Sequence, residues 1–351
     1  MLFPESFQKL FVTLSTTKSG SGATVLQVPV KIFTLRHSPI QSSIIAPSEA
    51  SRKVLLLLHG YPQNHTLYYE TVHELSKAGM LESWDVVIPD LPGYGRSTKI
   101  PSGDGSHYEN SKRAIAADCV ALIDKMYGAG QRFIVAGHDR GARVAYRMAK
   151  DFRDRILGIC LMEIIPTKLM FEINNDLFVW LSQGMNSSND HQLTLNTYHW
   201  IFLAQPPNLP ETLIGASSDY YFSHTIESWT GPRYRGHLDP IAVASWVEQY
   251  RNPAVLTGSL EDYRAGASID LEHDKIDETS GNAVVDCPLL ILHTTKFLKQ
   301  HKDVAEIWES LGSKGVTVKQ VGDDQVGHFL PIEAAAEAIP ELISWMHEIV
   351  S

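Results

Sequence analysis

Residues 133–143 read Phe-Ile-Val-Ala-Gly-His-Asp-Arg-Gly-Ala-Arg, an apolar run that ends in a turn bounded by two glycines. The run is short and bounded by turn residues, which is typical of a buried strand, and residues 140–152 form an amphipathic segment of helix length. Gly137 and Gly141 leave room for a strained turn around Asp139. The sequence therefore predicts a sharp strand-to-helix turn with a carboxylate at its centre.

Similar short apolar runs recur on both sides of this turn, and amphipathic segments such as 110–127 separate several of them. Strands that alternate with helices predict an α/β fold, in which a mostly parallel sheet is covered by helices on both faces. A terminal helix is expected over 332–349. The expected strands are 25–36, 54–58, 86–88, 133–136, 156–162, 289–292 and 316–321.

A chain of 351 residues is long enough for one large domain with an insertion. Residues 1–24 run into Thr-Lys-Ser-Gly-Ser-Gly, a composition that predicts a flexible N-terminal extension. Residues 25–166 and 251–351 carry the strand runs and form the predicted core. Residues 167–250 contain prolines and no continuous strand run, so they are predicted to form a helical cap inserted over the sheet.

Composition excludes several classes of protein. Hydrophobic residues make up 44% and charged residues 20%, which is ordinary for a globular protein and excludes disorder for most of the chain. The net charge of −10 shows that the chain lacks the excess of basic residues typical of proteins that bind nucleic acids or anionic membranes. An anionic ligand would therefore need a local cluster of positive charge. No membrane span or signal peptide is recognisable. The cysteines show no disulfide or zinc-ribbon spacing and favour a reducing, cytoplasmic location: Cys119, Cys160 and Cys287.

Asp139 is the candidate nucleophile. A carboxylate is already ionised at pH 7, so it can attack carbon without a base, and it forms an ester that water must then hydrolyse. His59-Gly60-Tyr61-Pro62 follows the predicted strand 54–58, where the Tyr61 backbone N–H and that of Arg140 could form an oxyanion hole. Gly327-His328-Phe329 follows the last strand and places His328 at the same edge of the sheet.

Taken together, these segments resemble the α/β-hydrolases of the haloalkane dehalogenase and epoxide hydrolase group, and most of all the fluoroacetate dehalogenases. The resemblance covers residues 50–351. It implies an α/β-hydrolase fold with a helical cap, and hydrolytic dehalogenation of short 2-haloacids through an aspartyl ester, with no cofactor or metal. Tyr61 stands where these enzymes usually carry Phe. The segments that carry the resemblance are Gly-His-Asp-Arg-Gly-Ala-Arg at 137–143, Tyr-His-Trp-Ile-Phe-Leu-Ala-Gln-Pro at 198–206, Glu-Asp-Tyr-Arg-Ala at 261–265 and Ile-Asp-Leu-Glu-His-Asp at 269–274.

Arg140 and Arg143 are the candidate anion-binding residues. They lie at positions i and i+3 of the predicted helix and so share a face beside Asp139. Two cations at a helix N-terminus oppose the helix dipole, which leaves two explanations open: a bound anion, or ion pairs with protein carboxylates. The resemblance implies that the pair binds the carboxylate of the substrate. It also implies a halide-binding set of His199, Trp200 and Tyr263, and a pocket aromatic, Trp229.

His328 is the candidate base, because neutral imidazole accepts a proton near pH 7. The acid that orients it would follow a predicted strand, and both Glu163 and Asp303 qualify. The resemblance favours Glu163, at a position where fluoroacetate dehalogenases carry Asp. The predicted catalytic set is therefore Asp139, Glu163 and His328.

Two other functions remain open. An epoxide hydrolase uses the same Asp and His but needs cap tyrosines to protonate the opened oxygen, and the arginine pair then favours a carboxylate-bearing or larger natural-product epoxide. A catalytically silent binding protein is the alternative from another class. The cap segment 182–197 is longer than the resemblance predicts, and the sequence leaves halide preference, stereochemistry and the assembly, including a homodimer, undecided. The candidate cap tyrosines are Tyr198, Tyr220, Tyr221 and Tyr263.

Overall fold

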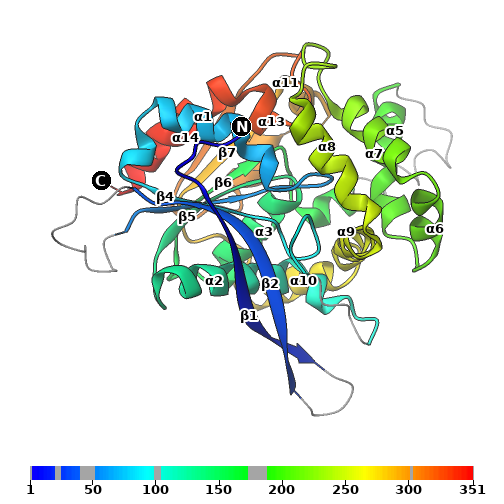
Figure 1. The fold of residues 1–351 in the computed structure, drawn as a ribbon, viewed down its shortest axis with the longest axis horizontal. Coiled ribbons are helices and arrows are strands. Elements are labelled where there is room, and N and C mark those ends of the chain that lie inside the picture. The colour runs from blue at the N-terminus through cyan, green and yellow to red at the C-terminus, as the bar shows by residue number, and fades with distance from the viewer. Residues whose placement is uncertain are drawn as a thin grey trace.

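An eight-stranded sheet forms the centre of the protein (Figure 1). The computed structural model describes residues 2–19, 25–39, 52–98, 104–172, 188–300 and 303–350. The strand order is β1-β2-β4-β3-β5-β6-β7-β8; β2 pairs antiparallel with β1 and β4, and all other neighbours are parallel. The strands are β1 (Gln8–Ser19), β2 (Val25–His37), β3 (Val54–Leu58), β4 (Asp85–Pro89), β5 (Phe133–His138), β6 (Ile156–Met162), β7 (Leu289–His293) and β8 (Val316–Gln320).

Helices cover both faces of the sheet, because each parallel connection must cross from one end of the sheet to the other. Figure 1 shows α2 and α3 on one face and α1 and α14 on the other. The mostly parallel α/β architecture predicted from the sequence is confirmed. The helices of these layers and their short connections are α1 (Tyr69–Lys77), α2 (Lys112–Tyr127), α3 (Arg140–Asp151), α10 (Ile269–Ser280), α11 (Thr295–Gln300), α12 (Val304–Glu309), α13 (Leu330–Glu333), α14 (Ala335–Val350), η2 (His65–Tyr68), η3 (Met80–Glu82) and η4 (Tyr108–Asn110).

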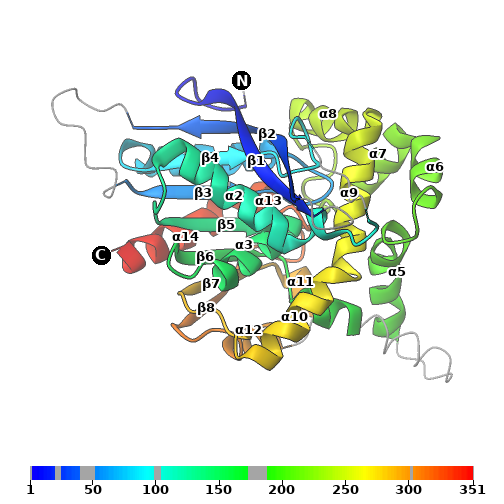
Figure 2. The ribbon, with the colours of Figure 1, turned by 90° about the horizontal axis from the view of Figure 1, so that it is seen from below.

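A group of helices between β6 and β7 gathers at one end of the sheet (Figure 2). The predicted cap insertion, 167–250, is mostly helical from residue 188 onward, with turns over 204–208 and 230–239, and residues 173–187 lie outside the described residues. None of the described helices is both long and apolar enough to cross a bilayer. The helices at this end are α5 (Ser188–Leu203), α6 (Leu209–Gly215), α7 (Ser218–Trp229), α8 (Pro240–Glu248), η5 (Gln249–Arg251) and α9 (Pro253–Gly266).

The N-terminal segment corrects the expectation of a flexible extension over 1–24. Gln8–Ser19 forms β1 and pairs with every residue of β2 except His37, from Gln8 opposite Arg36 to Ser19 opposite Val25. Exposed and less exposed residues alternate from Leu10 to Ser15, and Leu14 is buried in the core. The Ser- and Thr-rich composition of this edge strand hid it, although its partner β2 is the next element of the chain. Residues 20–24 lie outside the described residues.

The sheet places the predicted catalytic residues at one edge. Asp139 directly follows β5, Glu163 follows β6, and His328 lies in the loop between β8 and α13. The carboxyl ends of parallel strands lie at the same edge of a sheet, so residues far apart in the sequence meet there. The cap helices stand over this edge, as the residues that line the cavity show below (Figure 2).

The turn after β5 is strained, and close packing holds it in place. Asp139 has φ 49° and ψ −116°, a backbone conformation that L-residues adopt rarely. A Cβ atom on Gly137 would lie 2.5 Å from the carbonyl oxygen of Gly141, and one on Gly141 would lie 2.2 Å from that of Leu58. Only glycine fits at these two positions, so strand β3 and the start of helix α3 can approach each other closely.

We predict that Gly141→Ala destabilises the fold by about 3 kcal/mol or prevents folding, because the new methyl group collides with backbone that cannot move independently. Gly215→Ala is the matched control. A Cβ atom at Gly215, near the end of α6, meets no atom within 4 Å, so this change is expected to be neutral or mildly stabilising. Urea denaturation of both variants measures the difference, and equal stabilities would contradict the packing argument.

Candidate active site

A cavity of about 290 Å³ lies between the carboxyl edge of the sheet and the cap helices. It brings together Asp139, Glu163 and His328 from three different loops of the core, as predicted. It also contains part of the predicted binding set: Arg143, His199, Trp200 and Trp229. Arg140, Tyr61 and Tyr263 do not line it and are buried behind these residues.

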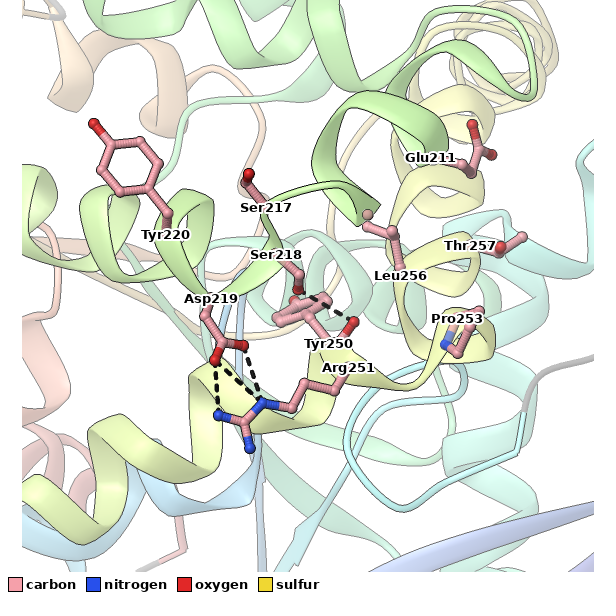
Figure 3. Close-up of a pocket in the computed structure, with 11 residues that line it drawn as sticks. Glu211, Ser217, Ser218, Asp219, Tyr220, Tyr250, Arg251, Pro253, Leu256 and Thr257 are labelled. Carbon is pink, nitrogen blue, oxygen red and sulfur yellow. Dashed lines mark hydrogen bonds and ion pairs between the residues drawn. The ribbon is translucent and has the colours of Figure 1, made fainter.

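A larger hollow of about 610 Å³ lies in the cap itself (Figure 3). Its walls come from α6, α7, η5 and α9, and the ion pair between Arg251 and Asp219 crosses one side of it. None of the predicted site residues lines this hollow. Size alone is therefore a poor guide here, and the smaller cavity is the candidate active site because the polar groups converge in it.

Asp139 is ionised in this environment. Burial alone would raise the pKa of its carboxyl group, but the positive potential of the surrounding residues outweighs burial and holds the pKa below its ordinary value. The cationic groups that lower it are Arg140 and Arg143, together with His328 when its imidazole is protonated. The carboxylate is thus negatively charged throughout the neutral pH range.

One oxygen of Asp139 is held by the backbone and the other faces the histidine. The Tyr61 N–H donates to Oδ1 over 2.9 Å, as predicted for one half of the oxyanion hole. The Arg140 N–H, predicted to be the other half, makes no hydrogen bond to this oxygen in the part of the chain that the structure describes. Oδ2 lies 3.8 Å from His328 Nε2. The two carboxylate oxygens therefore have different surroundings: Oδ1 is bonded to the backbone, and Oδ2 faces the imidazole.

His328 lies between the two carboxylates of the predicted set. Its Nδ1 is 3.8 Å from Glu163 Oε2, so the imidazole spans the distance from the acid to the nucleophile. Both separations exceed hydrogen-bond length, which is common in active sites without substrate. Glu163 is buried, and its other oxygen accepts the Thr294 N–H over 2.5 Å, which fixes the orientation of the carboxylate.

The alternative acid, Asp303, is not part of this arrangement. Asp303 is exposed, begins helix α12 and lines a separate hollow that also contains Lys150 and Tyr146. Glu163 is therefore the carboxylate that the structure places beside His328.

The two arginines have different environments. Arg140 is fully buried, and its Nε donates to Asp262 Oδ2 over 2.6 Å while Nη2 donates to the Asp262 carbonyl over 2.7 Å. Burial would lower the pKa of Arg140, but Asp262 outweighs burial and raises it. Lys112 and the Tyr94 hydroxyl also bind the Asp262 carboxylate. The charge of Arg140 is thus already compensated, although its Nη1 has no partner among the described residues.

Arg143 has no carboxylate within ion-pair distance among the residues that the structure describes. Its Nη1 donates to the Ile165 carbonyl over 2.9 Å and to the Thr167 hydroxyl over 3.0 Å, and its Nε has no partner there. Burial, followed by repulsion from Arg140, lowers the pKa of Arg143 to about 10. A buried cation in this state gains free energy from a bound anion, and Arg143 faces the cavity.

The three predicted halide ligands come together at the cap side. The ring centroid of Tyr263 is 6.0 Å from that of His199 and 5.8 Å from that of Trp200, and the latter two are 6.3 Å apart. Burial lowers the pKa of His199 to about 3, so its imidazole is neutral near pH 7. Burial, followed by the charge of Asp139, raises the pKa of Tyr263, so its phenol stays protonated. These are neutral donors, which can hydrogen-bond an anion without losing a proton.

The cap tyrosines divide into exposed and buried residues. Tyr220 is 73% exposed and lies in the wall of the larger cap hollow, which removes it from the chemistry at Asp139. Tyr198 lines the active cavity but is half exposed. The Tyr61 ring is fully buried and packs edge-on against Tyr263, with centroids 5.3 Å apart. Burial raises the pKa of Tyr221 and of Tyr61, so both phenols are weak acids.

Comparison with known proteins assigns the chain to a family. The family of the alpha/beta hydrolase fold matches residues 53–335. The chain belongs to the alpha/beta hydrolases. Within them it resembles the fluoroacetate dehalogenases: it is 36% identical to fluoroacetate dehalogenase from Burkholderia sp. over 241 residues, which are 69% of this chain and 70% of that protein.

Epoxide hydrolases are also among the relatives of this alpha/beta hydrolase. The soluble epoxide hydrolase of Corynebacterium sp. strain C12 is 24% identical over 285 residues, which cover 80% of this chain and 85% of that protein. A crystal structure of a protein from Nostoc sp. PCC 7120, provisionally assigned as an alpha/beta hydrolase, is 32% identical, covers 99% of both chains and superposes with a TM-score of 0.75. The fold is therefore shared over almost the whole chain. The relatives catalyse two different reactions, dehalogenation and epoxide hydrolysis.

Several supporting residues of this hydrolase site escaped sequence reasoning. Asp262 belongs to a segment that was singled out, but only the structure shows that it is the counter-charge of Arg140. Thr294 acts through its backbone N–H, which leaves no signal in residue type. Lys296, His224 and Ser228 also line the cavity, and nothing in their spacing indicated it.

We predict that the two arginines of the hydrolase affect stability differently. Arg140→Met leaves buried Asp262 with only Lys112 as its cationic partner and should lower the free energy of unfolding by about 3 kcal/mol. Arg143→Met removes a cation that has no carboxylate partner among the described residues, so the change should stay within about 1 kcal/mol. Denaturant unfolding of both variants measures this difference, and equal losses would show that Arg143 is compensated by the protein itself.

Proposed function

We propose that this alpha/beta hydrolase is a hydrolytic dehalogenase of short 2-haloacids, and that it forms an ester on Asp139. One observation carries the proposal: the cavity that contains the ionised Asp139 also contains Arg143, a buried cation without a carboxylate partner among the described residues. A substrate that joins a carboxylate to an electrophilic carbon would satisfy both groups. Similarity to fluoroacetate dehalogenase from Burkholderia sp. supports the same substrate class.

In the first step, Oδ2 of Asp139 attacks C2 of the haloacid from the side opposite the halogen. The new bond joins Oδ2 to C2, and the carbon–halogen bond breaks with its electron pair, which leaves as halide. Arg143 would hold the substrate carboxylate and thereby fix C2 in line, while Arg140, bonded to Asp262 behind the cavity wall, would add positive potential. His199 and Trp200, which line the cavity, would donate hydrogen bonds to the halide as its charge develops, and Tyr263, packed behind them, would donate only where the halide reaches between their rings.

In the second step, His328 accepts a proton from water, and the resulting hydroxide attacks Cγ of the Asp139 ester. The Tyr61 N–H stabilises the negative charge that forms on Oδ1. Collapse of this intermediate breaks the bond between Cγ and Oδ2, so the 2-hydroxy acid departs with Oδ2 and takes up the proton from His328. Glu163 stabilises the imidazolium in between.

Epoxide hydrolysis is the second candidate, because epoxide hydrolases are among the relatives and Tyr198 lines the cavity. The same ester would form, but the opened oxygen must take a proton from a tyrosine. Burial raises the pKa of Tyr263 and Tyr221, so both phenols are protonated near neutral pH. The buried cation Arg143 in the same cavity favours a substrate that carries a carboxylate over a neutral epoxide.

We also propose a cytoplasmic location. Cys119, Cys160 and Cys287 are free and buried. Burial raises the pKa of each thiol, to about 12 for Cys287, so the three cysteines are protonated and unreactive near neutral pH. Free thiols are compatible with a reducing compartment.

We predict that the protein releases fluoride from fluoroacetate and chloride from chloroacetate, and that Asp139→Asn lowers both rates by at least about 1000-fold because the amide is not a nucleophile. Halide-selective electrodes measure the release, and circular dichroism checks that the variant is folded. A parallel panel of neutral and carboxylate-bearing epoxides tests the second candidate. Epoxide opening without halide release would replace the proposal.

We predict that Glu163→Gln and Asp303→Asn separate the two candidate acids. Glu163→Gln should lower kcat by about 100-fold or more, because the imidazolium of His328 loses its counter-charge. Asp303→Asn is the matched control and should leave kcat unchanged, since Asp303 faces a different hollow. Steady-state halide release measures both, and a large loss in Asp303→Asn would reassign the acid.

A further inference from the structure

The loop that carries His328 is packed directly against the end of cap helix α7. The His328 N–H donates to the Trp229 carbonyl over 2.9 Å, and the ring centroids of these two residues lie 5.4 Å apart. A Cβ atom on Gly231 would lie 2.4 Å from the Gly327 nitrogen, and one on Gly327 would lie 2.2 Å from the Gly231 nitrogen. Backbone therefore touches backbone where the cap meets the histidine loop.

At this close approach, three backbone N–H groups donate hydrogen bonds to one carboxylate, that of Glu333. Glu333, at the end of α13, is 1% exposed. Its Oε2 accepts the Gly231 N–H over 2.8 Å and the Gly327 N–H over 2.7 Å, and its Oε1 accepts the Phe329 N–H over 3.0 Å. Two of these donors immediately flank His328, and the third belongs to the segment that leaves the cap.

A second contact holds the other side of the same loop. His138 Nε2 donates to the His328 carbonyl over 2.7 Å, and burial lowers the pKa of His138 to about 3, so that ring is neutral. The backbone of His328 is thus bonded through its N–H and its carbonyl, and the N–H groups on both sides of it are bonded to Glu333. The main chain at the base has little freedom to shift.

We propose that Glu333 is the positioning residue for the base: its carboxylate joins the cap to the histidine loop and thereby sets the distance from His328 to the Asp139 ester. The proposal rests on the proposed function for its kinetic consequence. Glu333 does not line the cavity and touches no reacting atom. Its effect must therefore pass through the backbone of residues 327–329.

The two half-reactions respond differently to such a residue. Attack by Asp139 on C2 needs no base, whereas hydrolysis of the ester needs His328. A histidine displaced by about 1 Å would slow hydrolysis by about 100-fold and leave ester formation nearly unchanged. A residue that only supports the fold would weaken both steps together.

Glu333→Gln tests this difference, because the amide has one acceptor oxygen instead of two. If that oxygen takes the place of Oε2, the Phe329 N–H loses its acceptor; if it takes the place of Oε1, the Gly231 and Gly327 N–H groups lose theirs. With chloroacetate, the variant should release a first equivalent of chloride at the wild-type rate. The following turnovers should be about 100-fold slower, and intact-mass spectrometry should show the ester accumulating.

Glu337→Gln is the matched control. Glu337 lies four residues further on and also accepts a backbone N–H, that of Gly322 over 2.8 Å, but it does not bind the histidine loop. This variant should keep the wild-type kcat and accumulate no ester. Equal slowing of the first and later turnovers in Glu333→Gln, or equal effects in the two variants, would overturn the positioning role.

Hydrogen–deuterium exchange provides a readout that does not depend on activity, and its wild-type measurement does not depend on the variant folding. In the wild-type protein, peptides that contain the Gly231, Gly327 and Phe329 amides should exchange slowly although they lie in loops. In Glu333→Gln these peptides should exchange at least about tenfold faster, and in Glu337→Gln they should not. Rapid exchange of these amides in the wild-type protein would contradict their bonding to Glu333 and overturn the positioning role. Slow exchange without any halide release would reject only the proposed reaction.

Discussion

The strained backbone of Asp139 is the constraint on which the site depends. At φ 49° and ψ −116° the carboxylate projects from the end of β5 into the cavity, and this conformation persists because glycines let β3 and α3 close around it. A Cβ atom on Gly60 would lie 2.5 Å from the Cβ of Asp139, so the turn that donates the Tyr61 N–H must also be free of a side chain there. The same close packing thus presents one carboxylate oxygen and fixes the other.

Charge compensation assigns the neighbouring cations to different tasks. Asp262, buried and bound by Lys112 and Arg140, forms a charge network that is complete without a ligand. Arg143 is outside this network, and its pKa of about 10 reflects burial without a carboxylate partner among the described residues. Two arginines on one helix face therefore do not form an equivalent pair. Arg140 mainly supports the site, whereas Arg143 lacks a carboxylate partner among the described residues and can bind an anion.

Sequence reasoning succeeded where chemistry depends on residue type in a local pattern. Short apolar runs predicted strands β3 and β6. The turns after such runs predicted the strand-to-helix turn at Asp139 and the positions of Glu163 and His328. Sequence reasoning failed for β1, an edge strand of Ser- and Thr-rich composition beside β2, and it could not choose between Glu163 and Asp303 from order alone. Contacts made by backbone groups, such as those of Thr294 with Glu163 and of Gly327 with Glu333, leave no pattern that could be read in advance.

The central claim is that the chemistry proceeds through an ester on Asp139, and a single turnover in H₂¹⁸O tests it most directly. With enzyme in excess over chloroacetate, water attacks Cγ, so the heavy oxygen should enter the Asp139 carboxylate while the 2-hydroxy acid carries an unlabelled hydroxyl group. Mass spectrometry of the peptide that contains Asp139 and of the product distinguishes the two positions. Heavy oxygen in the product of the first turnover, with none in the peptide, would show direct attack by water and contradict the account.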